Sequence, residues 1–200
     1  MMTIYLAPTE TIDFDAPNVR AKARELAASI ADERALVARY FTFVRDAIKH
    51  SWDHRLNPVT CRASDVLRHG TGYCYAKSHL LAALLRASGI PAGLCYQRLA
   101  VGDAGPPYCL HGLNAVYLRD LGWYRLDARG NKPGIATRFS PPHEALAYPA
   151  SGPGEQDCPH IFAEPLPVVT AALTQYADIH LIDANLPDLD LSAFDGPINR

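Results

Sequence analysis

The sequence predicts an α+β fold, in which helices come first and an antiparallel sheet follows them. Helical patterns occupy 18–30 and 32–50, and in the second pattern apolar residues recur at spacings of three and four. A third helical pattern, at 73–88, is so rich in Ala and Leu that little polar surface is left. Strand patterns separated by short turns then lie at 93–100, 110–118 and 123–128. We therefore expect a central buried helix packed on an antiparallel meander.

The boundaries between these elements are marked by turn and helix-ending residues. Gly89 and Pro91 mark the C-terminus of the third helix. The segment 51–58 predicts a loop, because an Asn-Pro pair interrupts any helix there. At the N-terminus, 3–7 predicts a short strand, which would precede the first helix.

The length of 200 residues fits a single domain, which we take to span 1–200. The composition changes beyond Gly130, where Pro and Gly become frequent. We therefore expect 132–200 to be a C-terminal extension that wraps irregularly around the rest, with a helix only at 168–176.

Composition and charge exclude several classes of partner. The chain has 19 basic and 21 acidic residues, a formal net charge of -2, and no basic run for a nucleic-acid backbone. It has no apolar stretch long enough to span a membrane, and the N-terminus has no basic region of a signal peptide. Five cysteines without a CxxC pair are typical of reduced thiols. These observations predict a cytoplasmic protein without nucleic-acid or membrane partners.

Cys74 is the candidate nucleophile. It lies in the first turn of the predicted buried helix, where unpaired N–H groups and the positive end of the helix dipole stabilise a thiolate. The preceding segment 70–72 contains two glycines, which would let a substrate carbonyl approach the sulfur and the Cys74 N–H. The alternative is a structural cysteine packed as a small apolar residue.

His111 and Asp127 are the candidate partners of Cys74. If Arg119, Asp120 and Leu121 form a three-residue hairpin loop, His111 lies opposite residue 129, and Asp127 is its diagonal neighbour on the same sheet face. The carboxylate of Asp127 could then orient the imidazole, which would take the thiol proton. Each residue alone has a simpler structural explanation, so the prediction depends on the combination.

The sequence gives less support to other candidate sites. Cys109 and His111 are two residues apart, but a zinc site needs four ligands and no second cluster follows. We therefore expect no metal and no cofactor. Tyr73, Tyr75 and Trp123 could line an apolar cleft for a substrate, with core packing as the alternative.

Three segments resemble the core of the transglutaminase-like superfamily: Gly72 to Lys77, Leu84 to Ala92, and Gly122 to Asp127. In that superfamily a Gly-x-Cys opens the central helix, a His begins a strand, and an Asp follows a Gly-Trp pair on the next strand. The resemblance covers about 18–131. It implies a papain-like arrangement of helices and antiparallel sheet, with Cys74, His111 and Asp127 as a catalytic triad. One departure is Gly112-Leu113-Asn114 after the His, where members often have Ala-Trp and an acidic residue.

The resemblance leaves three functions open. The expected one is a cysteine-dependent amide hydrolase of the peptidase or amidase type, which acts on a peptide or protein through a thioester. The second is a transglutaminase that passes the acyl group to an amine, since the choice depends on how the site excludes water. The third is a noncatalytic protein-binding module on the same fold. The substrate and the oligomeric state are left open.

Overall fold

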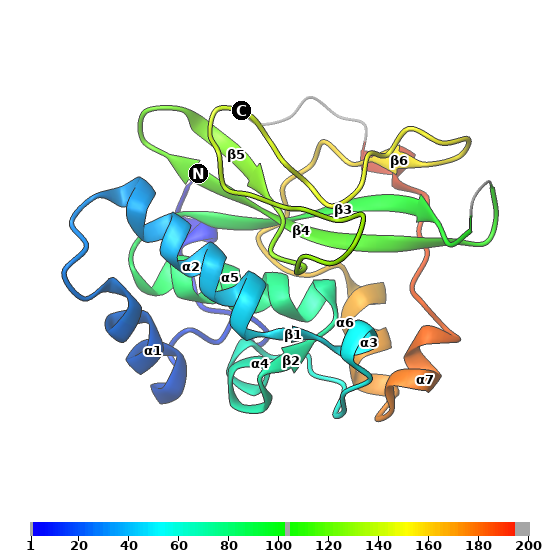
Figure 1. Ribbon diagram of the computed structural model, residues 1–200, viewed down its shortest axis with the longest axis horizontal. Coiled ribbons are helices and arrows are strands. Elements are labelled where there is room, and N and C mark those ends of the chain that lie inside the picture. The colour runs from blue at the N-terminus through cyan, green and yellow to red at the C-terminus, as the bar shows by residue number, and fades with distance from the viewer. Residues whose placement is uncertain (1, 103–104, 195–200) are drawn as a thin grey trace.

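The structure is organised around one buried helix, α5 (Cys74–Ala87), which lies against an antiparallel sheet (Figure 1). The computed structural model describes residues 2–102 and 105–194, and in these residues the sheet has the strand order β5–β4–β3–β6. The strands are β3 (Ala92–Ala100), β4 (Tyr108–Leu118), β5 (Gly122–Leu126) and β6 (Gln156–Asp157). Every residue of α5 except Ala87 is buried. The predicted α+β fold, with a central helix on an antiparallel sheet, is confirmed.

The N-terminal helices pack against α5 and cover the side of it that faces away from the sheet (Figure 1). They are α1 (Pro17–Ala27), α2 (Glu33–Ala47) and α4 (Ala63–His69). The start of α2 is set by Asp32, whose side chain accepts the Ala35 N–H at 2.7 Å. Both predicted helices are confirmed, but they end at Ala27 and Ala47 and not at 30 and 50.

The reason that α2 ends early is a strand pairing that the sequence did not predict. Lys49–His50 forms strand β1, which pairs in parallel with β2 (Thr71–Gly72), directly before Cys74. The segment 51–58, predicted as a loop, also begins with a short helix, α3 (Ser51–His54). The parallel pair places His50 beside the N-terminus of α5.

The hairpin between β4 and β5 has the predicted register. Leu118 pairs with Gly122, so the three residues between them form the turn, and Gly122 has a φ of 85°. That left-handed conformation favours glycine. The register continues along the strands to Asn114 opposite Leu126. Part of the other predicted turn, 102–107, lies outside the described residues.

Both faces of the sheet are buried, in line with the period-two alternation of strands. Leu94, Leu110 and Leu126 belong to the main core with α5, whereas Cys95 and Leu113 face a second, smaller core. The 3-10 helix η1 (Met2–Tyr5) covers that second face. The strand predicted at 3–7 is therefore wrong: Tyr5 is held by its ring against Trp123 and by its hydroxyl on Ile161, not by backbone pairing.

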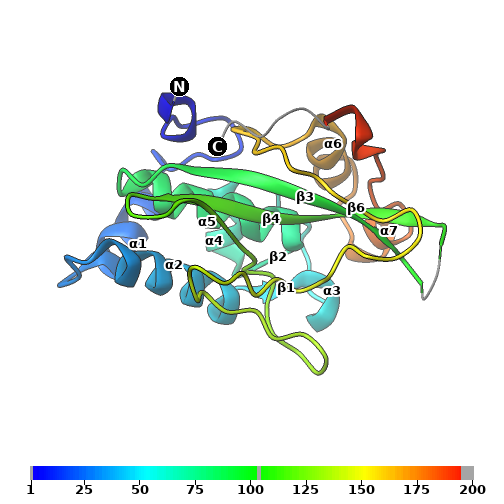
Figure 2. The ribbon, with the colours of Figure 1, turned by 90° about the horizontal axis from the view of Figure 1, so that it is seen from above.

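The C-terminal part wraps around the sheet and the end of α5. In Figure 2 its yellow to red segments run along β3 and then reach α6 (Pro167–Gln175) and α7 (Ile179–Asp183). A 3-10 helix, η2 (Leu191–Phe194), follows. The helix predicted at 168–176 is confirmed as α6, while α7, η2 and β6 were not predicted.

Two buried cations on α5 connect it to the surrounding segments. The Lys77 ammonium donates to the carbonyl of Ile48, just before His50, and burial lowers the pKa of Lys77 to about 7. The Arg86 guanidinium donates to the carbonyls of Ala7 at 2.8 Å and Ala163 at 2.6 Å. The central helix is thus joined to both ends of the described chain.

The N-terminus of α5 approaches β4 so closely that only glycine fits at position 112. A Cβ there would lie 2.9 Å from Tyr75 Cδ1 and 3.1 Å from Tyr75 Cα. We therefore expect Gly112→Ala to lower the free energy of unfolding by about 1 to 3 kcal/mol, because the backbone of α5 or β4 must move. Denaturant unfolding measures this change. Gly102→Ala is the control, since a Cβ at Gly102 meets nothing within 4 Å; equal effects of the two substitutions would contradict the packing described.

Candidate active site

Cys74 is the first residue of α5, and its thiol lies against the backbone of β4. The side chain is nearly buried, and its Sγ accepts the N–H of Gly112 at 3.5 Å. The first hydrogen bond of the helix runs from the Lys77 N–H to the Tyr73 carbonyl. The N–H of Cys74 therefore has no acceptor within the helix and is available at its N-terminus.

His111 and Asp127 form a buried pair beside this thiol. His111 Nε2 lies 2.8 Å from Asp127 Oδ2, and both side chains are almost completely buried. The carboxylate also accepts the backbone N–H of Arg129 on Oδ1 and that of Ala147 on Oδ2, each at 3.0 Å. The carboxylate is thus fixed by three donors, and its bond to Nε2 leaves Nδ1 of the ring for the thiol.

The charges of this group reinforce one another. Burial lowers the pKa of His111, but the Asp127 carboxylate and the Cys74 sulfur raise it more, to about 10. Burial raises the pKa of Asp127, but His111 and the two backbone donors outweigh it and hold that pKa below 3.8. An imidazolium between a carboxylate and a sulfur is therefore the favoured state near neutral pH.

Burial dominates the environment of three other thiols, Cys61, Cys95 and Cys109. Burial raises the pKa of Cys61 to about 11 and that of Cys95 and Cys109 to about 12. Cys109 lines the same cleft as Cys74, so it offers an internal comparison between two neighbouring thiols.

A cleft of about 360 Å³ opens at Cys74 and His111 and is also lined by Tyr73 and Tyr75. The hydroxyls of both tyrosines donate to backbone carbonyls, Tyr73 to Ile179 at 3.2 Å and Tyr75 to Leu110. Their rings, not their hydroxyls, are therefore the surface that they can offer to a substrate.

Trp123 is not brought to this cleft. It lines a separate hollow of about 680 Å³ with Tyr117 and Arg125, and it packs on Tyr5. Trp123 belongs to the smaller core on the second face of the sheet, near the start of β5, where Tyr5 of the N-terminal segment packs on it.

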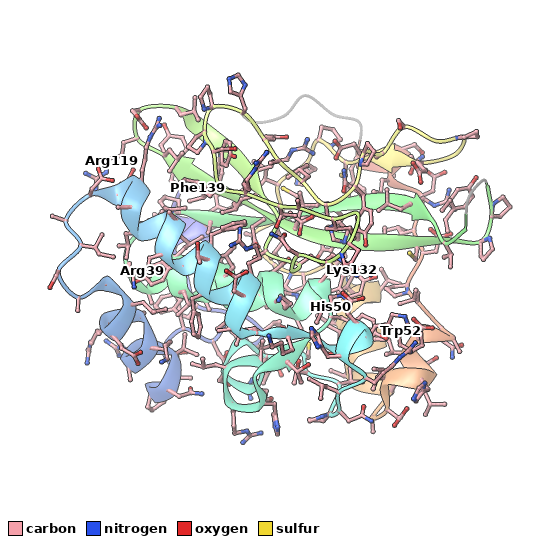
Figure 3. All side chains as sticks on the ribbon, in the orientation of Figure 1. Arg39, His50, Trp52, Arg119, Lys132 and Phe139 are labelled. Atoms are coloured by element: carbon pink, nitrogen blue, oxygen red, sulfur yellow. The ribbon has the colours of Figure 1, made fainter. Side chains whose placement is uncertain are left out.

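The cleft also contains groups that the sequence did not point to, among them His50, Lys132 and Tyr148. Trp52, for which a place in the cleft and core packing were both open, lines the cleft as well, and Figure 3 shows it near His50 and Lys132. Burial lowers the pKa of His50 well below 6.5, so its ring is neutral and offers one donor and one acceptor. Tyr148 stands edge-on to the His111 ring, with centroids 5.0 Å apart. The pattern around 148 gave no signal, because these contacts join distant segments.

The alternative of a metal site has no support in the described part of the chain. No cluster of three or more His, Cys, Asp or Glu residues there could hold a metal ion. His111, which was considered with Cys109 as a ligand, uses Nε2 for Asp127.

A model of the transglutaminase-like superfamily matches residues 20–128, more than half of the 200 residues. The chain therefore belongs to the transglutaminase-like superfamily, whose members are mostly enzymes with cysteine-based catalysis. The matched range includes Cys74, His111 and Asp127, whereas Tyr148 and α7 lie beyond it. A search of curated proteins finds no match.

Solved structures show similar cores. A candidate cysteine protease from Cytophaga hutchinsonii matches with a TM-score of 0.51 and 21% identity over 64% of this chain and 42% of that chain. The periplasmic domain of TgpA from Pseudomonas aeruginosa matches with a TM-score of 0.47 and 26% identity, over 62% and 45%. A TGase matches with a TM-score of 0.45 and 18% identity, over 68% and 37%. The match thus spans less than half the length of each protein, and the first likeness agrees with the papain-like fold.

The pair of His111 and Asp127 predicts a pH-dependent contribution to stability. The pKa of His111 is raised from 6.5 to about 10, so its stabilisation is complete below 6.5 and is lost as the pH rises through about 10. The pKa of Asp127 is lowered from 3.8, so its stabilisation is present above 3.8 and is lost as the pH falls below it. We expect Asp127→Asn to cost about 3 kcal/mol near pH 6 and less as the pH approaches about 10.

Denaturant unfolding of both proteins across this range measures the difference. Glu25→Gln, which alters an exposed pair with Lys22, is the control and is expected to cost well under about 1 kcal/mol. A destabilisation by Asp127→Asn that does not change with pH would contradict the assigned charges.

Proposed function

We propose that the protein is a cysteine-dependent amide hydrolase that acts on peptides or proteins through a thioester at Cys74. The observation that supports this most is the buried pair of His111 and Asp127 beside the Cys74 sulfur, which accepts the N–H of Gly112, the residue after His111. Nucleophile, base and orienting group then lie in one connected arrangement, as in cysteine–histidine catalysis. Tyr73 and Tyr75 would contribute ring surface to the substrate cleft.

In the proposed reaction His111 Nδ1 holds the proton of Cys74, and the thiolate attacks the amide carbonyl carbon. The N–H of Cys74 donates to the oxyanion that forms, because it has no helical acceptor. His111 returns its proton to the leaving amine as the C–N bond breaks, which leaves a thioester. Water then attacks the thioester with His111 as the base, and the acid and the free thiol are released.

The two alternative functions differ from this proposal in different ways. A transglutaminase would use an amine in place of water to attack the thioester. A noncatalytic binding module would not need the sulfur, the imidazole and the carboxylate in one contact group, which favours an enzyme. Hydrolysis agrees with the description of the Cytophaga hutchinsonii protein as a candidate cysteine protease.

The proposal extends to partners and to the organisation of the chain. It takes 1–200 as one domain, because Ala147 and Tyr148 of the extension contact the site. A peptide or protein amide is the proposed partner, without a cofactor, and the cytoplasmic location stays a prediction. No helix among residues 2–102 and 105–194 is long and apolar enough to cross a membrane.

The test is the fate of the acyl group in water labelled with ¹⁸O, with a mixed peptide library as substrate and a primary alkylamine present. We expect ¹⁸O in newly formed carboxylates, and a loss of about 10⁴-fold or more in Cys74→Ala. Cys61→Ser is the control, because that half-buried thiol lies outside the cleft. Amine incorporation that depends on Cys74 would favour the transglutaminase, and label incorporation that survives Cys74→Ala would refute the proposed nucleophile.

A further inference from the structure

Asp183, the last residue of α7, lines the cleft at Cys74, and α7 lies beyond the range matched by the superfamily model. The helix is attached to the core at three points. Its Ile179 carbonyl accepts the Tyr73 hydroxyl, the Ile179 N–H donates to Asn57 at 2.9 Å, and His180 packs edge-on against Trp52. Because Tyr73 directly precedes Cys74, α7 has a fixed position relative to the nucleophile.

The last residue of α7, Asp183, presents a carboxylate to this cleft. Among the described residues, the side chain of Asp183 has no hydrogen bond and no ion pair. Burial raises the pKa of Asp183, and the more distant charges of Arg55 and His180 offset this only in part. Tyr73 also lines this cleft, and burial, Asp183 and Cys74 all raise its pKa.

The other carboxylates around the cleft already have partners within the protein. Asp127 is held by His111, and Asp53 pairs with Arg129 at 2.7 Å and with Lys132 at 2.8 Å. Glu155 accepts backbone N–H groups, including that of Gly152 at 2.8 Å. Among these carboxylates, that of Asp183 is the one without a direct partner in the described residues.

Two basic side chains also line the cleft. Arg129 and Lys132 both line it and share the single carboxylate of Asp53, so one positive charge is left over. A cationic group on a substrate would be repelled there and attracted toward Asp183.

We propose that Asp183 binds the ammonium or guanidinium group of a basic side chain in the peptide substrate, so that this enzyme prefers substrates with Lys or Arg near the reactive amide. This inference rests on the proposed function, since it identifies the substrate class of the same cleft. Asp183 would supply the charge-assisted hydrogen bond that orients the substrate, while α7 supplies its fixed position.

The test is peptide binding to a Cys74→Ala background, which needs no turnover. Two peptide libraries are compared by isothermal titration calorimetry, identical except for one position that is Lys in the first and norleucine in the second. We expect the Lys library to bind about tenfold more tightly, the size of one hydrogen bond to a charged group. Asp183→Asn should remove that preference, and Asp183→Glu should restore part of it.

The matched control is Asp188→Asn, which removes the same charge five residues further along, at a surface pair with Arg98 outside the cleft. This variant should keep the preference for Lys. Equal binding of the two libraries, or an equal loss of preference in Asp183→Asn and Asp188→Asn, would overturn the proposal. Thermal unfolding of each variant shows whether a loss of the preference for Lys comes from misfolding. If Asp183→Asn is misfolded, the binding preference of Asp183→Glu decides the outcome.

The two proposals fail separately in this design. If the Cys74→Ala protein prefers Lys but the wild-type protein hydrolyses no library, the hydrolase is refuted and the Asp183 site stands. If the wild-type protein hydrolyses both libraries equally and binding shows no preference, the hydrolase stands and the Asp183 site is refuted.

Discussion

The N-terminus of α5 lies directly against β4 at Gly112, and the rest of the candidate site depends on this contact. Gly112 leaves room for the backbone of Tyr75 and donates its N–H to the Cys74 sulfur. The neighbouring residue on the strand is His111, so the approach of helix and strand sets the distance between thiol and imidazole. A side chain at position 112 would separate the two elements and with them the two groups.

The charge state of each buried side chain in the site depends on its burial and on the charged or polar groups beside it. Burial disfavours the charged form of an imidazole and lowers the pKa of His50, whose neighbouring carboxylate, Asp53, is shared with Arg129 and Lys132. His111 is buried to a similar degree but lies beside Asp127, and the carboxylate reverses the direction of its pKa shift. Three donors in turn keep Asp127 ionised, one of them the Ala147 N–H of the C-terminal extension. The extension therefore takes part in the charge state of the group and does more than cover the sheet.

The sequence predicted the parts of the site that short-range rules determine. The turn before Gly122 set the hairpin register, and that register placed Asp127 diagonally from His111. The apolar pattern of the central helix predicted that Cys74 lies in its first turn. Tyr148 and Asp183 escaped prediction because their positions depend on contacts between distant segments, such as Tyr73 with Ile179. Trp123 was assigned to the cleft from its neighbourhood in sequence, but it lies near the start of β5, where it packs on Tyr5 and lines a separate hollow.

The central claim is that Cys74 is a thiol activated by His111, and its neighbour Cys109 allows a direct measurement. Both line one cleft, but burial raises the pKa of Cys109 to about 12. Peptide mapping after brief treatment with iodoacetamide near neutral pH compares their alkylation rates. The account predicts that Cys74 reacts at least about tenfold faster, and that His111→Gln removes most of this advantage. Equal rates at Cys74 and Cys109 in the wild-type protein would contradict it.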